Sequence, residues 1–254
     1  MKLDAYHLKL FAIIAMVLNH IVIAWWAITP IYLAFPMYAV GGITFPIMAF
    51  FVVEGYKHTS SLKRYVLRIL VVGIIALPFH FLTLGLALAP SLNIMFTIAL
   101  SLGVLKMYDK IKSRVLFWII FVLIIIPISL IFEWSFPGVA MVLLFYIIKK
   151  ERVRRILPPL VAVALSLLLS LIYLIPGMEM PEMTGLMADP MFALVSATFV
   201  IGMALSSVLL AKFNGERGKK MKWLFYAFYP AHLAVLAIVA LILGLVNFTT
   251  LGAW

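Results

Sequence analysis

Cysteine is absent from this chain of 254 residues, which excludes disulfide bonds, thiolate catalysis and cysteine-ligated metal sites. Charged side chains are also scarce, at 11% of the residues, whereas hydrophobic side chains make up 66%. Soluble proteins use roughly 45–50% apolar residues, so this composition is far outside their range. The composition therefore predicts an all-α, polytopic membrane protein.

Hydrophobic runs of about 20 residues predict membrane-spanning helices. We expect about nine of them in one bundle, forming a single domain over residues 1–254. The sixth run is short and opens on Pro137–Gly138, so it is expected to be tilted, partly buried or re-entrant. The first is too long for the core of a cleavable signal peptide. The predicted ranges are 8–28, 33–56, 65–84, 91–106, 115–132, 136–148, 156–175, 191–211 and 223–246.

Basic residues are confined to alternate connections between these spans. Those at 57–64, 106–114, 149–155 and 212–222 carry Lys and Arg, and those at 29–32, 85–90, 133–135 and 176–190 carry neither. With Lys2, Lys9 and Arg68 counted in the neighbouring connections, all 20 basic residues fall on one side. The positive-inside rule then predicts a cytoplasmic N-terminus and an external C-terminus in the plasma membrane. Orientation and contact with membrane lipids explain the net charge of +11, and no nucleic acid partner is expected.

Ionisable residues inside spans are costly in lipid and usually face the protein interior or a water-filled cavity. In the first span, Lys9 and His20 are eleven positions apart, so they share a helix face about 16 Å apart. This helix thus carries a cation at its cytoplasmic mouth and a titratable ring near the midplane. The alternative is that Asn19 and His20 only make hydrogen bonds between packed helices.

The last span offers a second ring at similar depth. Tyr229 and His232 flank Pro230, which frees a backbone carbonyl inside the helix. Two imidazoles at one level make a better site candidate than either alone. Without a carboxylate at that depth they are a weak metal motif, so no metal is expected.

Two further groups of polar residues lie near the ends of spans. Arg64 and Arg68 form a two-guanidinium face that suits phosphate, since guanidinium forks match phosphate oxygens. In the alternative interpretation, Glu54 pairs with one of these arginines while the other contacts lipid headgroups. Towards the outer side, Asn93 and His80 are expected to act mainly as structural hydrogen-bonding partners.

Several blocks of the sequence, in order, resemble the TraX family of conjugal-transfer membrane proteins, whose namesake acetylates pilin. They are LDAYHLKLFAIIAMVLNH, ITFPIMAFFVVEGYKHT, SLKRYVLR, LNIMFTIAL and FYPAHL. Residues of about 107–222 match only in hydrophobic rhythm. The family resembles a wider class of bacterial transmembrane acyltransferases, in which a basic residue of the first helix and a histidine, with ten residues between them, form a signature. Lys9 and His20 resemble it, with Lys for the usual Arg, and Arg64 and Arg68 resemble an Arg-rich segment at spacing four rather than three.

The resemblance implies an integral membrane acetyltransferase that uses cytoplasmic acetyl-CoA. His20 would act as general base or acetyl carrier, and the basic residues would hold the donor's phosphates. The implied catalytic residues are His20, His232, Asn19, Tyr229 and Asn93. The implied donor-binding residues are Lys9, Glu54, His58, Lys63, Arg64 and Arg68.

Other functions stay open on the sequence alone. A small-solute or proton-coupled transporter would use midplane histidines as a relay, although no inverted repeat is evident. An intramembrane protease would need a serine elbow or an His-Glu-x-x-His helix, and neither motif is present. A purely structural assembly factor is a further alternative. The acceptor and a homo-oligomeric state are also left open.

Overall fold

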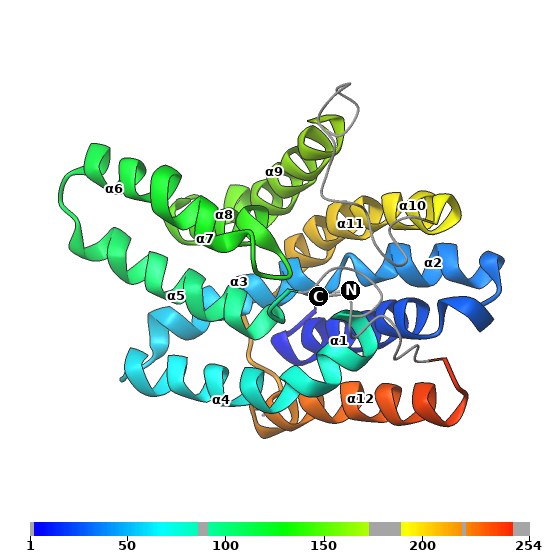
Figure 1. The fold of residues 1–254 in the computed structure, drawn as a ribbon. Helices are drawn as coiled ribbons and strands as arrows, with labels where there is room; N and C mark the ends of the chain where they lie inside the picture. The colour runs from blue at the N-terminus through cyan, green and yellow to red at the C-terminus, as the bar shows by residue number, and fades with distance from the viewer. Residues whose placement is uncertain (1–2, 86–90, 173–188, 220–221, 246–254) are drawn as a thin grey trace.

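The computed structural model describes residues 3–85, 91–172, 189–219 and 222–245, and helices dominate every one of these stretches (Figure 1). In this part of the chain, β-pairing is limited to two isolated bridges, Leu3 with Phe213 and Leu92 with Phe132. The elements are α1 (Ala5–Ala24), η1 (Trp26–Ile28), α2 (Ile31–Gly41), α3 (Thr44–His58), α4 (Leu62–His80), η2 (Phe81–Gly85), α5 (Ile94–Lys110), α6 (Arg114–Ile120), η3 (Phe121–Ile125), α7 (Ile126–Ser129), α8 (Ser135–Ile147), α9 (Glu151–Ile172), α10 (Pro190–Ala197), α11 (Phe199–Ala211) and α12 (Lys222–Ile242).

Each of the nine predicted ranges contains helix. In the described ranges, five helical segments are long and apolar enough to cross a membrane, and two shorter apolar helices cover Arg114–Ser129 and Ser135–Ile147. The five are Ala5–Ala24, Ile31–His58, Leu62–Leu84, Pro190–Ala211 and Leu224–Ile242. The chain is therefore an all-α polytopic membrane protein, as the composition predicts. Of the predicted outer connection 176–190, residues 176–188 lie outside the described residues.

Two predicted spans are broken within the described residues, and the seventh begins furthest ahead of its predicted start. The second predicted span divides at Gly42–Ile43, one turn before Pro46. Pro46 therefore falls in the first turn of α3, where its missing N–H costs no hydrogen bond within the helix. The eighth divides at Thr198. The seventh begins at Glu151, inside the basic stretch that the sequence analysis treats as a connection.

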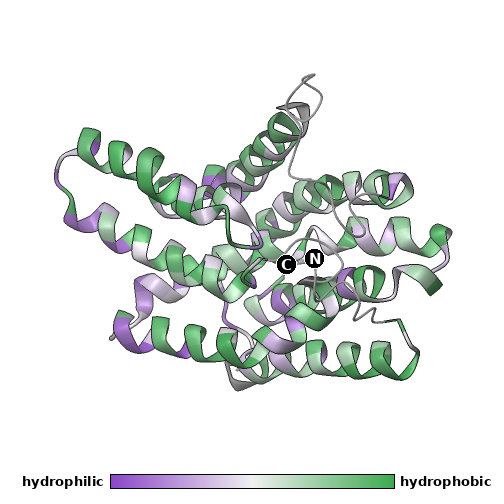
Figure 2. Cartoon of the chain, in the orientation of Figure 1, coloured by the Kyte–Doolittle hydropathy of each residue, from purple (hydrophilic) through white to green (hydrophobic). Residues whose placement is uncertain are grey.

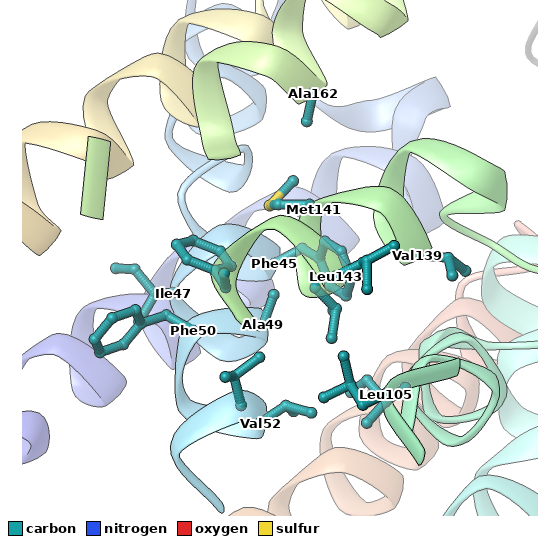
Figure 3. Close-up of a cluster of buried hydrophobic side chains, with 14 of the residues drawn as sticks. Phe45, Ile47, Ala49, Phe50, Val52, Leu105, Val139, Met141, Leu143 and Ala162 are labelled. Carbon is teal, nitrogen blue, oxygen red and sulfur yellow. The ribbon is translucent and has the colours of Figure 1, made fainter. Parts of the chain in front are cut away.

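The helix α1 lies within the bundle and packs against α2, α3, α12 and the π-helical turn η2 (Figure 1). On one side of it, α12 also packs against α4; on the other, α11 packs against α2, α3 and α9. The main apolar core lies between α3, α5, α8 and α9, where Phe45, Leu105, Met141 and Leu143 gather (Figure 3). Phe50 belongs to the same core and packs edge-on against Phe145 of α8. This core fixes α3, and α3 in turn supports α1.

Backbones meet closely where α11 crosses the break in the second span. A Cβ on Gly42 would collide with the carbonyl oxygen of Phe199, and a Cβ on Gly202 would collide with that of Ala39. Small residues at such crossings let helices in lipid approach closely, because packing rather than the hydrophobic effect drives their association.

The basic connections meet at one end of the bundle, which we call the basic end. There, Asp109 of α5 accepts hydrogen bonds from Tyr56 of α3 at 2.5 Å and Tyr146 of α8 at 2.6 Å. Arg155 of α9 donates to the carbonyl oxygen of Phe213 after α11 at 2.5 Å. Figure 2 shows hydrophilic residues at the turns from α3 to α4 and from α5 to α6, whereas the helix surfaces away from them are largely apolar.

Candidate functional site

The two histidines at similar predicted depth are in direct contact. His20 on α1 is 4% exposed and His232 on α12 is 8% exposed. His20 Nδ1 and His232 Nε2 are 2.8 Å apart, and the rings stack with their centroids 5.1 Å apart. The structure thus brings together two residues 212 positions apart, on helices that lie side by side (Figure 1).

Hydrogen bonding fixes which nitrogens of this pair carry protons. His232 Nδ1 lies 2.9 Å from the carbonyl oxygen of Phe228, so it must donate. In a neutral ring, His232 Nε2 is then an acceptor, and His20 Nδ1 must donate to it. His20 Nε2 is left with a free lone pair, and no hydrogen bond to it is found among the described residues. The pair therefore presents an unprotonated nitrogen of His20.

His20 lines a cavity of about 90 Å³, which we call the small cavity. Asn19, Thr44, Glu133 and Tyr229 line it as well, and the remaining walls are mostly aromatic rings and methionines. Asn19 Oδ1 and the Tyr229 hydroxyl are buried without a hydrogen-bond partner in the described part of the chain. Buried polar atoms are nearly always paired, so these two are free to bind a ligand. His232 does not line the small cavity.

Glu133 is a cavity residue that the sequence analysis places in an outer connection without a role. One of its carboxylate oxygens accepts a hydrogen bond from the backbone N–H of Ile94 at 2.8 Å. Backbone hydrogen bonds between Leu92 and the segment Ile131–Glu133 draw this turn into the bundle. Burial there raises the pKa of Glu133 to about 7. An acid just before an apolar helix gives no signal in a single sequence that distinguishes it from an exposed loop residue.

A second cavity of about 250 Å³, which we call the large cavity, adjoins the small one. Met48, Met95, Ile98 and Phe225 line both, so they form the partition between the two. Lys9, which is predicted to lie at the mouth of the first span, lines the large cavity. Its ammonium lies over the ring of Phe51, at 4.6 Å from the centroid, and over that of Phe225, at 5.3 Å.

The remaining residues predicted to bind the donor are dispersed. Lys63 and Arg64 are exposed on α4, and neither lines the large cavity. Arg68 is half-buried beside the Tyr65 ring, with its Nε buried and unpaired within the described residues. His58 lies 2.8 Å from the backbone carbonyl of Glu54, one turn back along α3.

Glu54 has a different partner from those predicted. Its carboxylate pairs with the guanidinium of Arg154 on α9 at 2.6 Å and with Lys57 at 3.3 Å. Glu151 completes the pairing of Arg154 at 2.8 Å. The interpretation in which Glu54 pairs with an arginine of α4 is therefore wrong. Glu54 instead joins α3 to α9, because α9 begins early enough to bring Arg154 into the bundle.

Asn93 and His80 hold the fold together. Asn93 caps α5 by accepting from the N–H of Met95, and its amide donates to the carbonyl of Gly73 at 2.9 Å. His80 Nε2 lies 3.1 Å from the carbonyl oxygen of Ser91. Neither residue lines the small cavity. Their positions agree with the structural role that the sequence analysis favours, whereas the catalytic role of Asn93 stays a prediction.

Comparisons with known proteins agree with the resemblance in the sequence. A family model described as TraX protein matches residues 5–240. A protein of Dichelobacter nodosus named "Probable fimbrial assembly protein FimC, serogroup H1" is 33% identical over 113 residues, covering 39% of this chain and 44% of that protein. The match thus spans less than half the length of that relative. No solved structure matches. Since the family model covers most of the chain, this membrane protein belongs to the TraX family.

Proposed function

We propose that this protein is an acetyltransferase of the bacterial plasma membrane, which moves an acetyl group from cytoplasmic acetyl-CoA to a hydroxyl or amine acceptor. The observation that carries the proposal is the hydrogen-bonded chain from Phe228 through His232 to His20. It presents the free nitrogen of His20 in a small, mostly apolar cavity. Such a nitrogen is suited to general base catalysis, because a neutral imidazole accepts a proton through its free lone pair.

In the proposed reaction, His20 Nε2 takes the proton from the acceptor as the acceptor's oxygen or nitrogen attacks the thioester carbonyl. The resulting imidazolium donates to His232 through Nδ1, a hydrogen bond that charge strengthens. The tetrahedral intermediate then expels the CoA thiolate, which takes the proton back from His20. His20 therefore ends the cycle neutral, and the new ester or amide carries the acetyl group.

The oxygen of the tetrahedral intermediate gains negative charge and needs hydrogen-bond donors. Tyr229 supplies a hydroxyl that lines the small cavity and is unpaired among the described residues. Asn19, one residue before His20, also lines the small cavity, and its side-chain N–H groups would supply a second donor. Asn93 acts at a distance, since its cap fixes the start of α5, whose Ile94 and Met95 line the cavity.

A second chemical route uses the same atoms. His20 Nε2 would attack the thioester itself and form an acetyl-imidazole, which the acceptor then cleaves. The two routes differ in whether acetylated protein accumulates without acceptor. Intact-mass analysis of the chain after acetyl-CoA treatment separates them, because only the covalent route adds an acetyl group to the wild type that His20→Ala lacks.

The donor is proposed to enter from the basic end through the large cavity. Lys9 and His20 are about 16 Å apart along α1, and the pantetheine arm has the length of about four extended residues, or roughly 15 Å. The arm can therefore reach from Lys9 to the small cavity once Met48 and Met95 of the partition move aside. Methionine side chains suit such a partition, because they are unbranched and flexible.

The nature of the acceptor follows from the comparison alone. The similar protein of Dichelobacter nodosus is named for fimbrial assembly. That name favours a filament subunit over a glycan or a small molecule as acceptor.

Release of CoA tests the proposal cleanly, because the chain has no cysteine to react with a thiol reagent. Membrane vesicles containing the wild type, supplied with a small amine or alcohol as acceptor of the acetyl group, should release CoA thiol from acetyl-CoA faster than vesicles without the protein. His20→Ala should reduce release to the background rate, whereas His80→Ala, which removes a buried histidine away from the cavity, should retain it. Equal release by wild type and His20→Ala would refute the proposal.

A further inference from the structure

The rim of the large cavity carries charge of one sign. Lys9, Arg217 and Lys219 line it, and no carboxylate does so among the residues that the structure describes. None of these three cations forms an ion pair within the described ranges. Two buried or half-buried arginines of this end, Arg154 and Arg155, are by contrast paired with Glu151. The rim cations are therefore available to an anionic ligand.

The nearest acids are occupied elsewhere. Asp4 caps α1, and its carboxylate accepts from both the backbone N–H and the ring of His7 at 2.8–2.9 Å. Glu216 accepts a hydrogen bond from the amide of Asn214 at 2.9 Å. Asp4 also lies against Gly218, the residue between Arg217 and Lys219 in the sequence, but it forms no ion pair with either of these cations.

The connection from α11 to α12 is fastened beside α1. The backbone N–H of Leu3 donates to Lys212, that of Asn214 donates to Leu3, and that of Ala5 donates to Glu216, all at 2.9–3.0 Å. These bonds attach residues 212–216 to the chain just before α1. They carry Arg217 and Lys219 to the same cavity mouth as Lys9, although more than 200 residues of chain separate the two segments.

Aromatic rings accompany the cations. Lys219 lies over the ring of Tyr6 at 5.6 Å, and Tyr6, Tyr65 and Tyr226 line the same cavity. A mouth with unpaired cations and aromatic faces suits a ligand that combines phosphates with a flat base, because cations bind phosphate oxygens and rings stack on bases. The inner part of the cavity is apolar and leads towards His20, which suits an uncharged arm.

We propose that Lys9, Arg217 and Lys219 bind the phosphates of the nucleotide end of the acyl donor. This proposal rests on the proposed acetyl transfer and moves the phosphate site away from Lys63 and Arg64, which lie outside the cavity. An anionic lipid headgroup presents the same phosphate chemistry at a membrane surface, so the experiment must distinguish the two sources.

The test measures binding of CoA and of pantetheine to the purified full chain in nanodiscs of zwitterionic lipid, by calorimetry. For the double variant Arg217→Ala/Lys219→Ala, we expect the Kd of CoA to rise roughly tenfold or more, because two phosphate contacts are lost. The Kd of pantetheine, which lacks the phosphates, should stay unchanged. The dependence of CoA binding on salt concentration should also weaken, since fewer charges take part.

The matched control is Lys150→Ala/Arg152→Ala. It removes the same two residue types at the same spacing, from exposed positions at the basic end that do not line the cavity and form no ion pair within the described chain. The control should change the Kd of CoA by less than about twofold, since exposed charges at a distance are screened. A third variant, Lys63→Ala/Arg64→Ala, tests the rival position for the phosphates.

The outcomes separate the two proposals. If the wild type neither binds CoA nor transfers acetyl groups, the proposed function fails. If it does both, but Arg217→Ala/Lys219→Ala binds CoA normally or Lys63→Ala/Arg64→Ala loses the affinity instead, only the present inference fails. If the rim variant loses retention of phosphatidylglycerol in native mass spectrometry while its Kd for CoA is unchanged, the rim is a lipid site and the inference is overturned.

Discussion

Replacing His232 with Ala isolates the role of the histidine pair. His232 does not line the small cavity, so it touches neither acetyl group nor acceptor in the proposed complex. Its only route to the reaction is the 2.8 Å hydrogen bond to His20 Nδ1. The substitution removes that acceptor and leaves the His20 N–H buried without a partner, or lets the proton move to Nε2, where it blocks the lone pair.

The size of the effect follows from the same hydrogen bond. A buried donor without a partner costs about 1–3 kcal/mol, and about 2.7 kcal/mol in the transition state corresponds to a hundredfold slower reaction. We therefore expect kcat for CoA release to fall about a hundredfold, with the KM for acetyl-CoA nearly unchanged. His232→Gln, which restores an acceptor oxygen, should recover part of the lost rate.

Steady-state CoA release at several acetyl-CoA concentrations measures both parameters, and tryptophan fluorescence during heating checks that the variant is folded. His80→Ala serves as the control, because it removes a buried imidazole that hydrogen-bonds Ser91 rather than His20. A folded His232→Ala protein with wild-type kcat would refute the argument that His232 sets the proton position on His20. So would a rise in KM with kcat unchanged.

Three other substitutions test the structure around the site. The pKa of Glu133 is raised from 4.5 to about 7, so the free energy of unfolding is highest below pH 4.5 and falls by roughly 3 kcal/mol as the pH rises through about 7. Glu133→Gln should flatten the pH dependence of thermal stability in that window. An unchanged profile would contradict the burial of Glu133. Arg154→Met should lower the free energy of unfolding, measured by denaturant titration, by about 3 kcal/mol. This is near the low end for a broken buried ion pair, because Glu54 is 28% exposed. Adding Glu54→Gln should restore part of the lost stability. Gly42→Ala should lower the free energy of unfolding by about 3 kcal/mol through overpacking against α11. Its control, Gly103→Ala, has nothing within 4 Å of the added carbon and should be neutral or stabilise by up to about 1 kcal/mol. Equal melting temperatures of the two variants would argue against the close crossing.

Much of the fold follows from the hydrophobic composition and from the length of the hydrophobic runs. The helix ranges are predictable because lipid demands long apolar helices, and buried histidines within them stand out against that background. His20 and His232 could thus be singled out from one sequence. Their 2.8 Å contact could not, because it depends on how α12 packs against α1.

The residues that the sequence analysis misses share a physical cause. Glu133, Arg154 and Arg217 sit in connections or in the first turn of a helix, where a charged residue is ordinarily solvated. Only tertiary structure shows that the turn with Glu133 folds inward, or that Arg154 meets an acid 100 residues away. Charge sign and position along the chain carry no information about such pairings.

The central claim is that a thioester entering from the basic end reaches His20. The most direct test is a cryo-electron microscopy map of the protein with a non-transferable ketone analogue of acetyl-CoA. We predict the ketone carbonyl in the small cavity within reach of His20 Nε2 and the Tyr229 hydroxyl, and the phosphates beside Lys9. A map in which the analogue binds elsewhere, with side chains sealing the small cavity around His20, would contradict the claim.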